Sequence, residues 1–376
     1  MAEKVFDGRR LTLSRWAAGL TKRELAEQIG VSAASVTQYE AGNTKPSPQT
    51  VGLAALCLGV PSEYLYADGS RRSPRLETRS FFRSLRATKQ WQRDQADAIA
   101  EHLYDLVAFL DERLQLPSVD IPSHPIPPTI TTTAGIEKIG TVVREAWSLP
   151  PGPISHVVRI LETRGVVVAR IPGVPAEVDA FSRWIEARPI VLLSSGKEDK
   201  GRSRFDAAHE LGHLVLHPEP EPGDRAQERQ AHAFAAAFLM PAAEIEPDLP
   251  RRVTRAEDWE LLFATRQRWG VSAAALLYRS RELDVLSDSA FRRAMTRLSQ
   301  LGLRRNDGSA LGEPEQPLLI ANALRSLQES FGFSLSDLAI ALHFSDRQLL
   351  DLLASWPEDG VDPPPQRHLR SVPLAS

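Results

Sequence analysis

Four of the nine histidines in this sequence of 376 residues lie within one short stretch, at positions 209–232. His209 and His213 are four residues apart in the segment RFDAAHELGHLVLH, so on a helix their imidazoles share one face. Two imidazoles at that spacing can bind one zinc ion, and Glu210 is placed to act on a bound water without being a ligand. The rest of the segment is largely apolar, which predicts a buried helix. A buried helix with two histidines and a glutamate needs a chemical reason.

A third ligand is expected from the next helix. Zinc sites that hydrolyse bonds use three protein ligands and leave a fourth position for water. The segment ERQAHAFAAAFLMP at 228–241 predicts a second apolar helix with Glu228 at its start. The loop at 218–227 contains prolines and a glycine, which allow the chain to turn back. If the two helices pack side by side, His209, His213 and Glu228 form a His2Glu set.

The elements around these helices indicate a mainly α protein with a small β-sheet, the α+β class. Helices are expected at 136–147 and 154–163, over most of 205–286 and again at 287–356. Two β-branched runs, GVVVARI at 165–171 and PIVLLSS at 189–195, predict the strands of the sheet. A helix is also predicted over 77–116. The proline-rich segment after it, at 117–128, marks the clearest domain boundary.

A separate pattern of short helices occupies the N-terminal part of the chain. Thr21 and Glu24 have the spacing of a capping box at the start of a first helix. Gly30 is expected to end that helix, and Ser32 to cap a second one that contains Val36. Two helices joined by a short turn with glycine are the helix-turn-helix layout.

This segment resembles the Cro/repressor-type (XRE) helix-turn-helix family over residues 8–66. The matching residues are Leu25-Ala26, Gly30-Val31-Ser32, Val36, Gln38-Tyr39-Glu40, Gly42 and Pro46-Ser47. The resemblance implies that the helix at 32–40 enters the major groove of double-stranded DNA, where Gln38 can read adenine. The candidate DNA-binding residues are Ser32, Ala33, Ala34, Ser35, Thr37, Gln38, Asn43 and Lys45. The alternative is a helical hairpin that contacts another protein.

The charge and composition fit such a module. Residues 1–93 carry 15 basic and 8 acidic side chains, whereas the remainder carries 30 basic and 40 acidic ones. A basic end beside an acidic body is common in chains with a nucleic-acid-binding module. The single cysteine, Cys57, excludes an intrachain disulfide, and no apolar run approaches the ~20 residues of a membrane helix. We therefore expect a cytoplasmic protein without a membrane partner.

The histidine-rich stretch resembles the ImmA/IrrE family of metallopeptidases, and the likeness covers about residues 134–286. The matching residues are Arg204-Phe205, His209-Glu210-Leu211-Gly212-His213, His217, Glu228, Ala231, Phe234-Ala235, Leu239-Met240-Pro241, the strand PIVLLSS, Trp269-Gly270-Val271-Ser272 and Ala275-Leu276. An N-terminal helix-turn-helix fused to this peptidase is a recurring arrangement in the family. The resemblance implies a zincin-like fold, zinc ligands His209, His213 and Glu228, and Glu210 as general base.

One position departs from the family pattern. Four residues after the ligand glutamate the family usually has asparagine, whereas this chain has His232. His232 could orient His209, replace Glu228 as a ligand, or close the site as a fourth ligand, and a closed zinc site is structural. His217 is expected to be a structural residue at the helix end. His232, Tyr278 and Arg279 are the candidates for an oxyanion partner.

The implied reaction is zinc-dependent hydrolysis of a peptide bond. Glu210 takes a proton from water and passes it to the leaving amine. The strand around Val191–Ser195 could align an extended substrate by edge pairing. The resemblance implies a protein substrate, such as a repressor of the same helix-turn-helix kind.

We therefore expect a transcription regulator with five regions. These are a helix-turn-helix domain at 1–70, a basic linker and connecting helix at 71–128, a zinc peptidase domain at 129–286, a C-terminal helical domain at 287–358 and a disordered tail at 359–376. Residues 334–352 echo the helix-turn-helix spacing, but their aspartates favour a packing or interaction element. The protein is expected to be a homodimer. The alternatives are a non-catalytic regulator whose metal domain senses a ligand or partner, and a phage-derived or antitoxin-type repressor.

Overall fold

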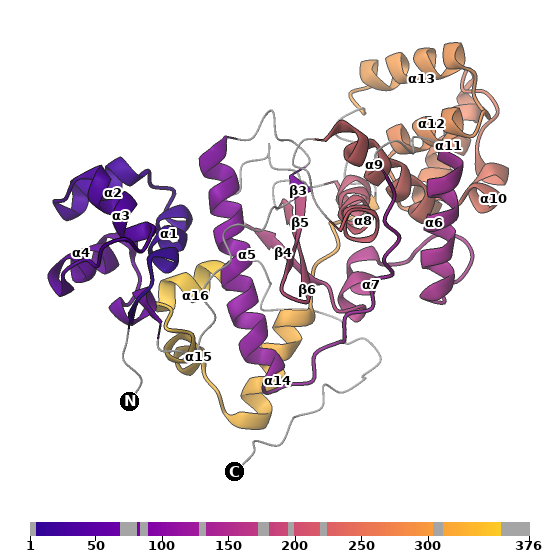
Figure 1. Cartoon of the computed structure of the whole chain (residues 1–376). Helices are drawn as coiled ribbons and strands as arrows, with labels where there is room; N and C mark the ends of the chain where they lie inside the picture. Colours follow the sequence, from indigo (N-terminus) through magenta and orange to yellow (C-terminus); the bar gives the residue numbers. More distant parts are fainter. Residues whose placement is uncertain are drawn as a thin grey trace.

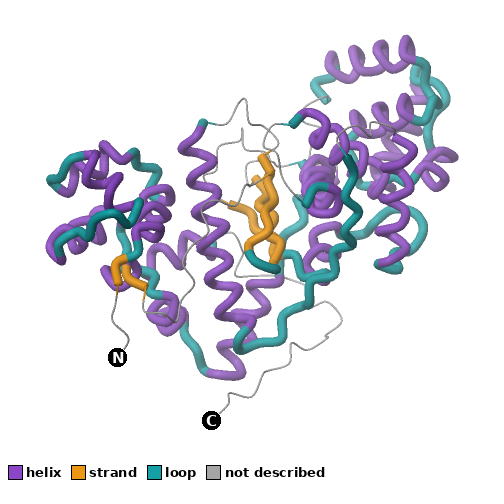
Figure 2. The backbone as a smooth tube through the Cα atoms, viewed as in Figure 1, coloured by secondary structure: helices purple, strands orange, loops and turns teal. Residues whose placement is uncertain are grey.

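The protein is mainly helical, with a small sheet near its centre (Figures 1 and 2). The computed structural model describes residues 5–67, 81–82, 89–127, 133–171, 180–194, 199–218, 224–303 and 311–354. The expected basic stretch at 69–75 and the expected tail at 359–376 lie outside these residues. Within the described residues, every helix is too short or too polar to span a bilayer.

The N-terminal bundle contains the expected pair of short helices. Thr21 and Glu24 form the predicted capping box, and Ser32 caps the second helix through the amide of Ser35. Gly30 has φ of 70° between the two helices, a left-handed conformation that glycine adopts without strain. The elements are β1 (Val5–Phe6), α1 (Gly8–Ala17), α2 (Lys22–Ile29), α3 (Ala33–Glu40), α4 (Pro48–Leu58), the 3₁₀ helix η1 (Ser62–Leu65) and β2 (Tyr66–Ala67).

The central sheet has four strands in the order β3-β5-β6-β4. β4 runs parallel to β6, and β5 runs antiparallel to both of its neighbours. The elements of this part are β3 (Phe81–Phe82), α5 (Gln90–Asp111), α6 (Thr133–Ala146), α7 (Val157–Thr163), β4 (Val167–Ile171), β5 (Ala180–Ile185) and β6 (Arg188–Ser194). β6 pairs with β4 on one side and with β5 on the other, so it lies inside the sheet, and the prediction that it is an edge for a substrate was wrong.

Side chains of the strands alternate between two hydrophobic clusters. On β6, Ile190 and Leu192 belong to the cluster that contains α5. Val191 and Leu193 belong to the cluster that contains the helices following the sheet in sequence. The sheet is therefore covered by α5 on one face and by α7 and α8 on the other (Figure 1). The first cluster also includes the core of the N-terminal bundle. α5 therefore shares one continuous hydrophobic core with the N-terminal bundle and with the sheet.

Two predictions about this region were wrong. The helix predicted over 77–116 begins only at Gln90, and Phe81–Phe82 instead pair with β5 as a short strand. The sheet was predicted with two strands, and β5 was missed because the run AFSRWI contains Ser182 and Arg183 side by side. Both polar residues are buried because they pair with acidic residues, Ser182 with Glu210 and Arg183 with Glu101.

The helices beyond the sheet form the second cluster. They are α8 (Lys200–Leu216), α9 (Arg225–Leu239), α10 (Ala242–Ile245), the 3₁₀ helix η2 (Glu246–Asp248), α11 (Ala256–Trp269), α12 (Ala273–Glu282) and α13 (Asp288–Gln300). α8 and α9 approach closely at Gly212, where an added Cβ would lie 3.1 Å from both the Cα and the carbonyl oxygen of Ala231.

The C-terminal helices return to the N-terminal bundle. They are α14 (Leu319–Phe331), α15 (Leu335–Leu342) and α16 (Asp346–Leu353). Glu315, just before α14, pairs with Arg204 of α8, whereas Ser345 before α16 donates a hydrogen bond to the carbonyl of Gly59. α15 and α16 thus have a helix-turn-helix outline but pack as a structural element against α5 and the N-terminal bundle (Figure 1).

Candidate metal centre

Helix α8 holds the two histidines and the glutamate on a buried element. Asp199 caps its first turn, and nearly every residue from Ser203 to Leu216 is buried. The side chains of His209 and His213 are each 1% exposed. Because four residues complete about one turn, both imidazoles point from the same face of α8 toward α9.

Glu228 of α9 completes a three-residue group with these histidines. The Nε2 atoms of His209 and His213 are 3.1 Å apart. One carboxylate oxygen of Glu228 lies 3.4 Å from His209 Nε2, and the other lies 3.5 Å from His213 Nε2. Tetrahedral zinc, with ligand bonds of about 2.0–2.1 Å, separates neighbouring ligand atoms by about 3.3 Å. The closest ligand atoms of the three side chains are therefore near the separation that one zinc ion requires.

The charge of Glu228 suits this role. Burial raises the pKa of its carboxyl group, but the hydrogen bonds and charges of His209 and His213 outweigh burial and lower the pKa to about 2. Glu228 is therefore ionised at neutral pH, as a metal ligand must be.

A chain of hydrogen bonds determines which nitrogen of His213 is available. Gln230 donates its side-chain amide to the carbonyl of Pro127, so its Oε1 accepts from His217 Nε2 at 2.9 Å. Burial, followed by the nearby His213, lowers the pKa of His217 to about 4, so His217 is neutral and its Nδ1 accepts. His213 then donates from Nδ1 to His217 Nδ1 at 3.1 Å, which leaves the lone pair of its Nε2 directed at the metal position.

The candidate base Glu210 is fixed by the sheet. Ser182 of β5 donates a hydrogen bond of 2.7 Å to Glu210 Oε2, and both residues are 0% exposed. A hydrogen bond to one carboxylate oxygen fixes the rotamer of Glu210 and brings β5 directly beside it. Gln230 and Ser182 were both missed by sequence reasoning, since neither has a spacing that distinguishes it from a surface residue.

Two of the other candidates, His232 and Tyr278, line a neighbouring cavity of about 720 Å³ between α9, α12 and α13. His232 lines it, is exposed and packs on the ring of Phe205 with centroids 4.9 Å apart. Tyr278 lines it as well and packs against Phe291. The group of possible ligands among the described residues contains Glu228 and not His232. Arg279 is buried in contacts with Glu137, Glu282 and the carbonyl of Met240.

The candidate DNA-binding residues lie around α3 and the turn that follows it. All of them are exposed except Ser35, which is partly buried beside the Ser32 cap. Gln38 points outward from the turn that follows the buried Val36. Thr37 donates its hydroxyl to the carbonyl of Ala33, so its methyl group faces outward with the helix surface.

Comparison with known families matches both parts of the chain. Residues 15–65 match a family described as helix-turn-helix, and residues 161–281 match the IrrE N-terminal-like domain of the M78 peptidases. This protein joins a helix-turn-helix domain to an IrrE N-terminal-like peptidase domain. No curated protein matches the chain. The match to the IrrE-like domain spans α8, α9 and all of β4 to β6, so the family region includes the three grouped ligands.

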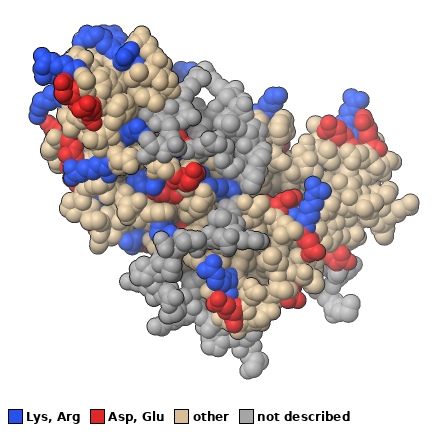
Figure 3. Space-filling model, turned by 180° about the vertical axis from the view of Figure 1, so that it is seen from behind, with Lys and Arg blue, Asp and Glu red and all other residues tan. Residues whose placement is uncertain are grey.

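Basic side chains also gather where the sequence analysis did not expect them. From behind the molecule, Lys and Arg side chains gather at the corner that holds α11 to α13, with acidic side chains beside them (Figure 3). Arg292, Arg293 and Arg297 are exposed there on α13. Sequence reasoning missed this corner because it counted charge along the chain.

Proposed function

We propose that this protein is a DNA-binding transcription regulator whose IrrE-like domain is a zinc-dependent endopeptidase. The observation that carries the proposal is the clustering of His209, His213 and Glu228, at separations near those of zinc ligands, beside the buried Glu210. A structural zinc site has four protein ligands, whereas this group offers three and leaves one position for water. The substrate class that the match to a peptidase family supports is a protein, and we propose a helix-turn-helix repressor as the candidate.

Different residues of the chain have different roles in the proposed reaction. A zinc ion held by His209, His213 and Glu228 would supply a Lewis acid for the carbonyl of the substrate and would lower the pKa of water. Glu210 accepts a proton from the attacking water and delivers it to the amine that leaves, while Ser182 keeps its carboxylate in place. His217 and Gln230 hold His213 in the tautomer that binds. α8 and β5 exclude bulk water from the base.

Metal content per chain is the first test of this proposal. We expect about one zinc per wild-type chain by elemental mass spectrometry, little zinc in Glu228→Ala and unchanged zinc in the matched variant His232→Ala. Glu210→Gln is expected to retain zinc and to lose hydrolysis by about 10²- to 10⁴-fold. Zinc that survives Glu228→Ala and disappears in His232→Ala would contradict the His2Glu site.

The proposal for DNA rests on the exposed face of α3. Because Ser32, Gln38 and Lys45 are exposed, α3 can enter a major groove and Gln38 can reach a base edge. A dimer would read two half-sites of DNA, so we also propose a homodimer, and a DNA partner supports a cytoplasmic location as part of the same proposal. Binding to the promoter region of its own gene should weaken in Gln38→Ala and Thr37→Ala, but not in Gln49→Ala, an exposed glutamine on α4.

A non-catalytic regulator is the second candidate, and the cavity beside α9 favours it. Its volume of about 720 Å³ is within the range of small-molecule sites, and its lining includes both charged and apolar residues. Full zinc content together with no hydrolysis of any protein substrate would move the conclusion to this candidate.

A further inference from the structure

Helix α13 presents a row of arginine side chains at an outer corner of the IrrE-like part. Arg292, Arg293 and Arg297 are exposed on this helix. Its other face, which includes Phe291 and Leu298, is buried in the hydrophobic cluster that also contains α8 and α9. The arginines therefore extend from a packed helix, at the opposite end of the molecule from the helix-turn-helix bundle (Figure 1).

The charges of this row are not neutralised within the chain. Among the residues that the structure describes, no carboxylate pairs with Arg292, Arg293 or Arg297. Three other exposed arginines at the same corner do have acidic partners at 2.6–3.4 Å, namely Arg252 with Asp258, Arg268 with Asp248 and Arg281 with Asp288. Like charges four residues apart, such as Arg293 and Arg297, weaken a helix slightly. A bound anion would offset that cost.

The exposed face of α13 suits phosphate groups. A guanidinium can donate two parallel hydrogen bonds to one phosphate. Ser289, Thr296 and Gln300 are exposed on the same helix, and hydroxyl and amide side chains accompany arginine in contacts with a DNA backbone. From Arg293 to Arg297 the helix rises about 6 Å, close to the axial distance of about 6.8 Å between phosphates two steps apart on one strand.

We propose that the arginine face of α13 is a second DNA-binding surface, which contacts phosphates of the duplex without reading its sequence. The inference rests on the proposed function for its ligand, because α3 is proposed to bind DNA. Duplex DNA is stiff over about 150 base pairs, so one duplex can extend from the half-site at α3 to the opposite end of the molecule. Contacts at α13 raise the affinity for long DNA and leave the sequence preference to α3.

The test compares two double variants of the full chain. Arg293→Gln/Arg297→Gln removes two unpaired charges from α13. Arg252→Gln/Arg268→Gln is the matched control, since it removes two charges from the same corner that already have acidic partners. Binding of a labelled random-sequence duplex, several helical turns long, is measured by fluorescence anisotropy between about 50 and 200 mM salt.

The salt dependence of binding gives the expected result. Each lost phosphate contact reduces the slope of log affinity against log salt by about 0.9, so the slope should fall by about 1.8 in the α13 variant. Over this range of salt the wild type then loses about 12-fold more affinity than the α13 variant. The control should keep the wild-type slope. The thermal midpoint of the α13 variant should be unchanged or higher, because two like charges are removed.

Equal slopes in the wild type and the α13 variant, or equal losses in both variants, would overturn the inference. A wild-type DNA slope together with weaker binding of poly-L-glutamate would overturn it as well, and would assign the face to an acidic protein. Gln38→Ala, measured on the promoter region of its own gene, tests α3 separately, since it removes no charge. If only Gln38→Ala weakens binding, the proposed function stands without the second surface. If only the α13 variant does, the role of α3 is rejected and the surface remains.

Discussion

Three glutamates of the IrrE-like part have the same side chain and different properties, because their partners differ. Glu228 faces two imidazoles and its pKa falls to about 2. Glu210 accepts from the hydroxyl of Ser182 within the core. Glu162 accepts from the amides of Leu318 and Leu319 at the start of α14, and its burial raises its pKa to about 7. Glu228 is therefore suited to bind a cation. Glu162 holds the start of α14 and is neutral or ionised depending on pH.

Glu162 is expected to make stability depend on pH. Its pKa is raised from 4.5 to about 7 in the folded chain, so the folded state holds the proton more tightly than the unfolded state. The contribution to stability is complete below pH 4.5 and is lost as pH rises to about 7. Relative to Glu162→Gln, which does not titrate, the wild type should lose up to about 3 kcal/mol across this window. Thermal unfolding of both proteins from pH 4.5 to 8 measures the difference, and a constant difference would show that Glu162 titrates normally.

Gln230 is expected to control metal affinity without touching the metal. Its replacement by Leu removes the acceptor for His217 Nε2, so nothing holds His213 in the tautomer with a free Nε2. We expect a loss of about 10- to 100-fold in zinc affinity for Gln230→Leu, the usual effect of such outer partners. Competition with a chelator gives the affinity. Gln227→Leu, on the same helix and also buried, is the control, and equal losses in both variants would indicate damage to α9 instead.

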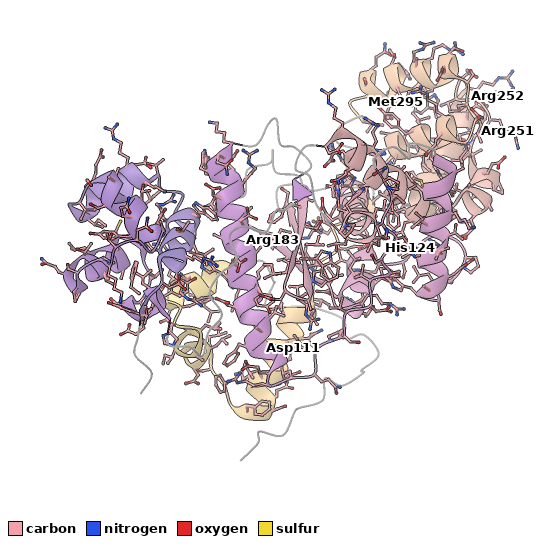
Figure 4. The ribbon with its side chains drawn as sticks, in the orientation of Figure 1. Asp111, His124, Arg183, Arg251, Arg252 and Met295 are labelled. Carbon is pink, nitrogen blue, oxygen red and sulfur yellow. The ribbon has the colours of Figure 1, made fainter. Side chains whose placement is uncertain are left out.

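At the scale of elements, the fit of α8 to its neighbours creates the site. Gly212 lets α9 approach closely enough for Glu228 to reach the imidazoles. Arg183, on the opposite face of β5 from Ser182, pairs with Glu101 of α5 at 2.8 Å, and both side chains are 1% exposed. At its other end α5 is tied to the sheet by Arg188 and Asp111; Figure 4 labels Arg183 and Asp111 along this interface. The strand that holds the base is therefore held in turn by α5.

The sequence predicts those parts whose pattern is local. The capping box at Thr21, the turn at Gly30 and the histidine spacing on α8 each depend on neighbours within one helical turn, and all three form as predicted. β5 could not be predicted, because its polar residues are satisfied by Glu210 and Glu101, which are distant in sequence. The start of α5 was predicted wrongly for the same reason, since only pairing with β5 explains why Phe81–Phe82 form a strand.

The pair of Arg183 and Glu101 is expected to be strongly coupled. Glu101→Leu removes the carboxylate that lies 2.8 Å from the buried guanidinium of Arg183 and should destabilise the protein by about 3–5 kcal/mol. The double variant Glu101→Leu/Arg183→Met removes both charges and should recover most of that loss. Urea unfolding of the wild type, both single variants and the double variant measures the coupling. Additive losses would show that the pair contributes through packing alone.

At the scale of the whole molecule, the DNA-binding domain and the central sheet are joined by α5 in one hydrophobic core. One hydrophobic cluster runs from Leu25 in α2 through Leu106 in α5 to Leu192 in β6. Arg10 of α1 also lies 3.6 Å from Asp105 of α5. The C-terminal helices close this arrangement, with Glu315 anchored at α8 and Phe344 against the N-terminal bundle. A change at the sheet can therefore reach the DNA-binding domain through packed side chains of the described residues.

Phe344 provides the sharpest test of that continuity. Its ring is 4% exposed and lies against Tyr64 of the helix-turn-helix domain and His102 of α5, with centroids 5.8 Å and 5.2 Å away. Phe344→Ala should destabilise the protein by about 3–5 kcal/mol and increase hydrogen exchange in 62–67 and 90–111 as well as in α15 and α16. Ile340→Ala, at a position 74% exposed on α15, should change stability by less than about 0.5 kcal/mol. If exchange rises in α15 and α16 alone, the C-terminal helices pack independently and the DNA-binding domain is not held by them.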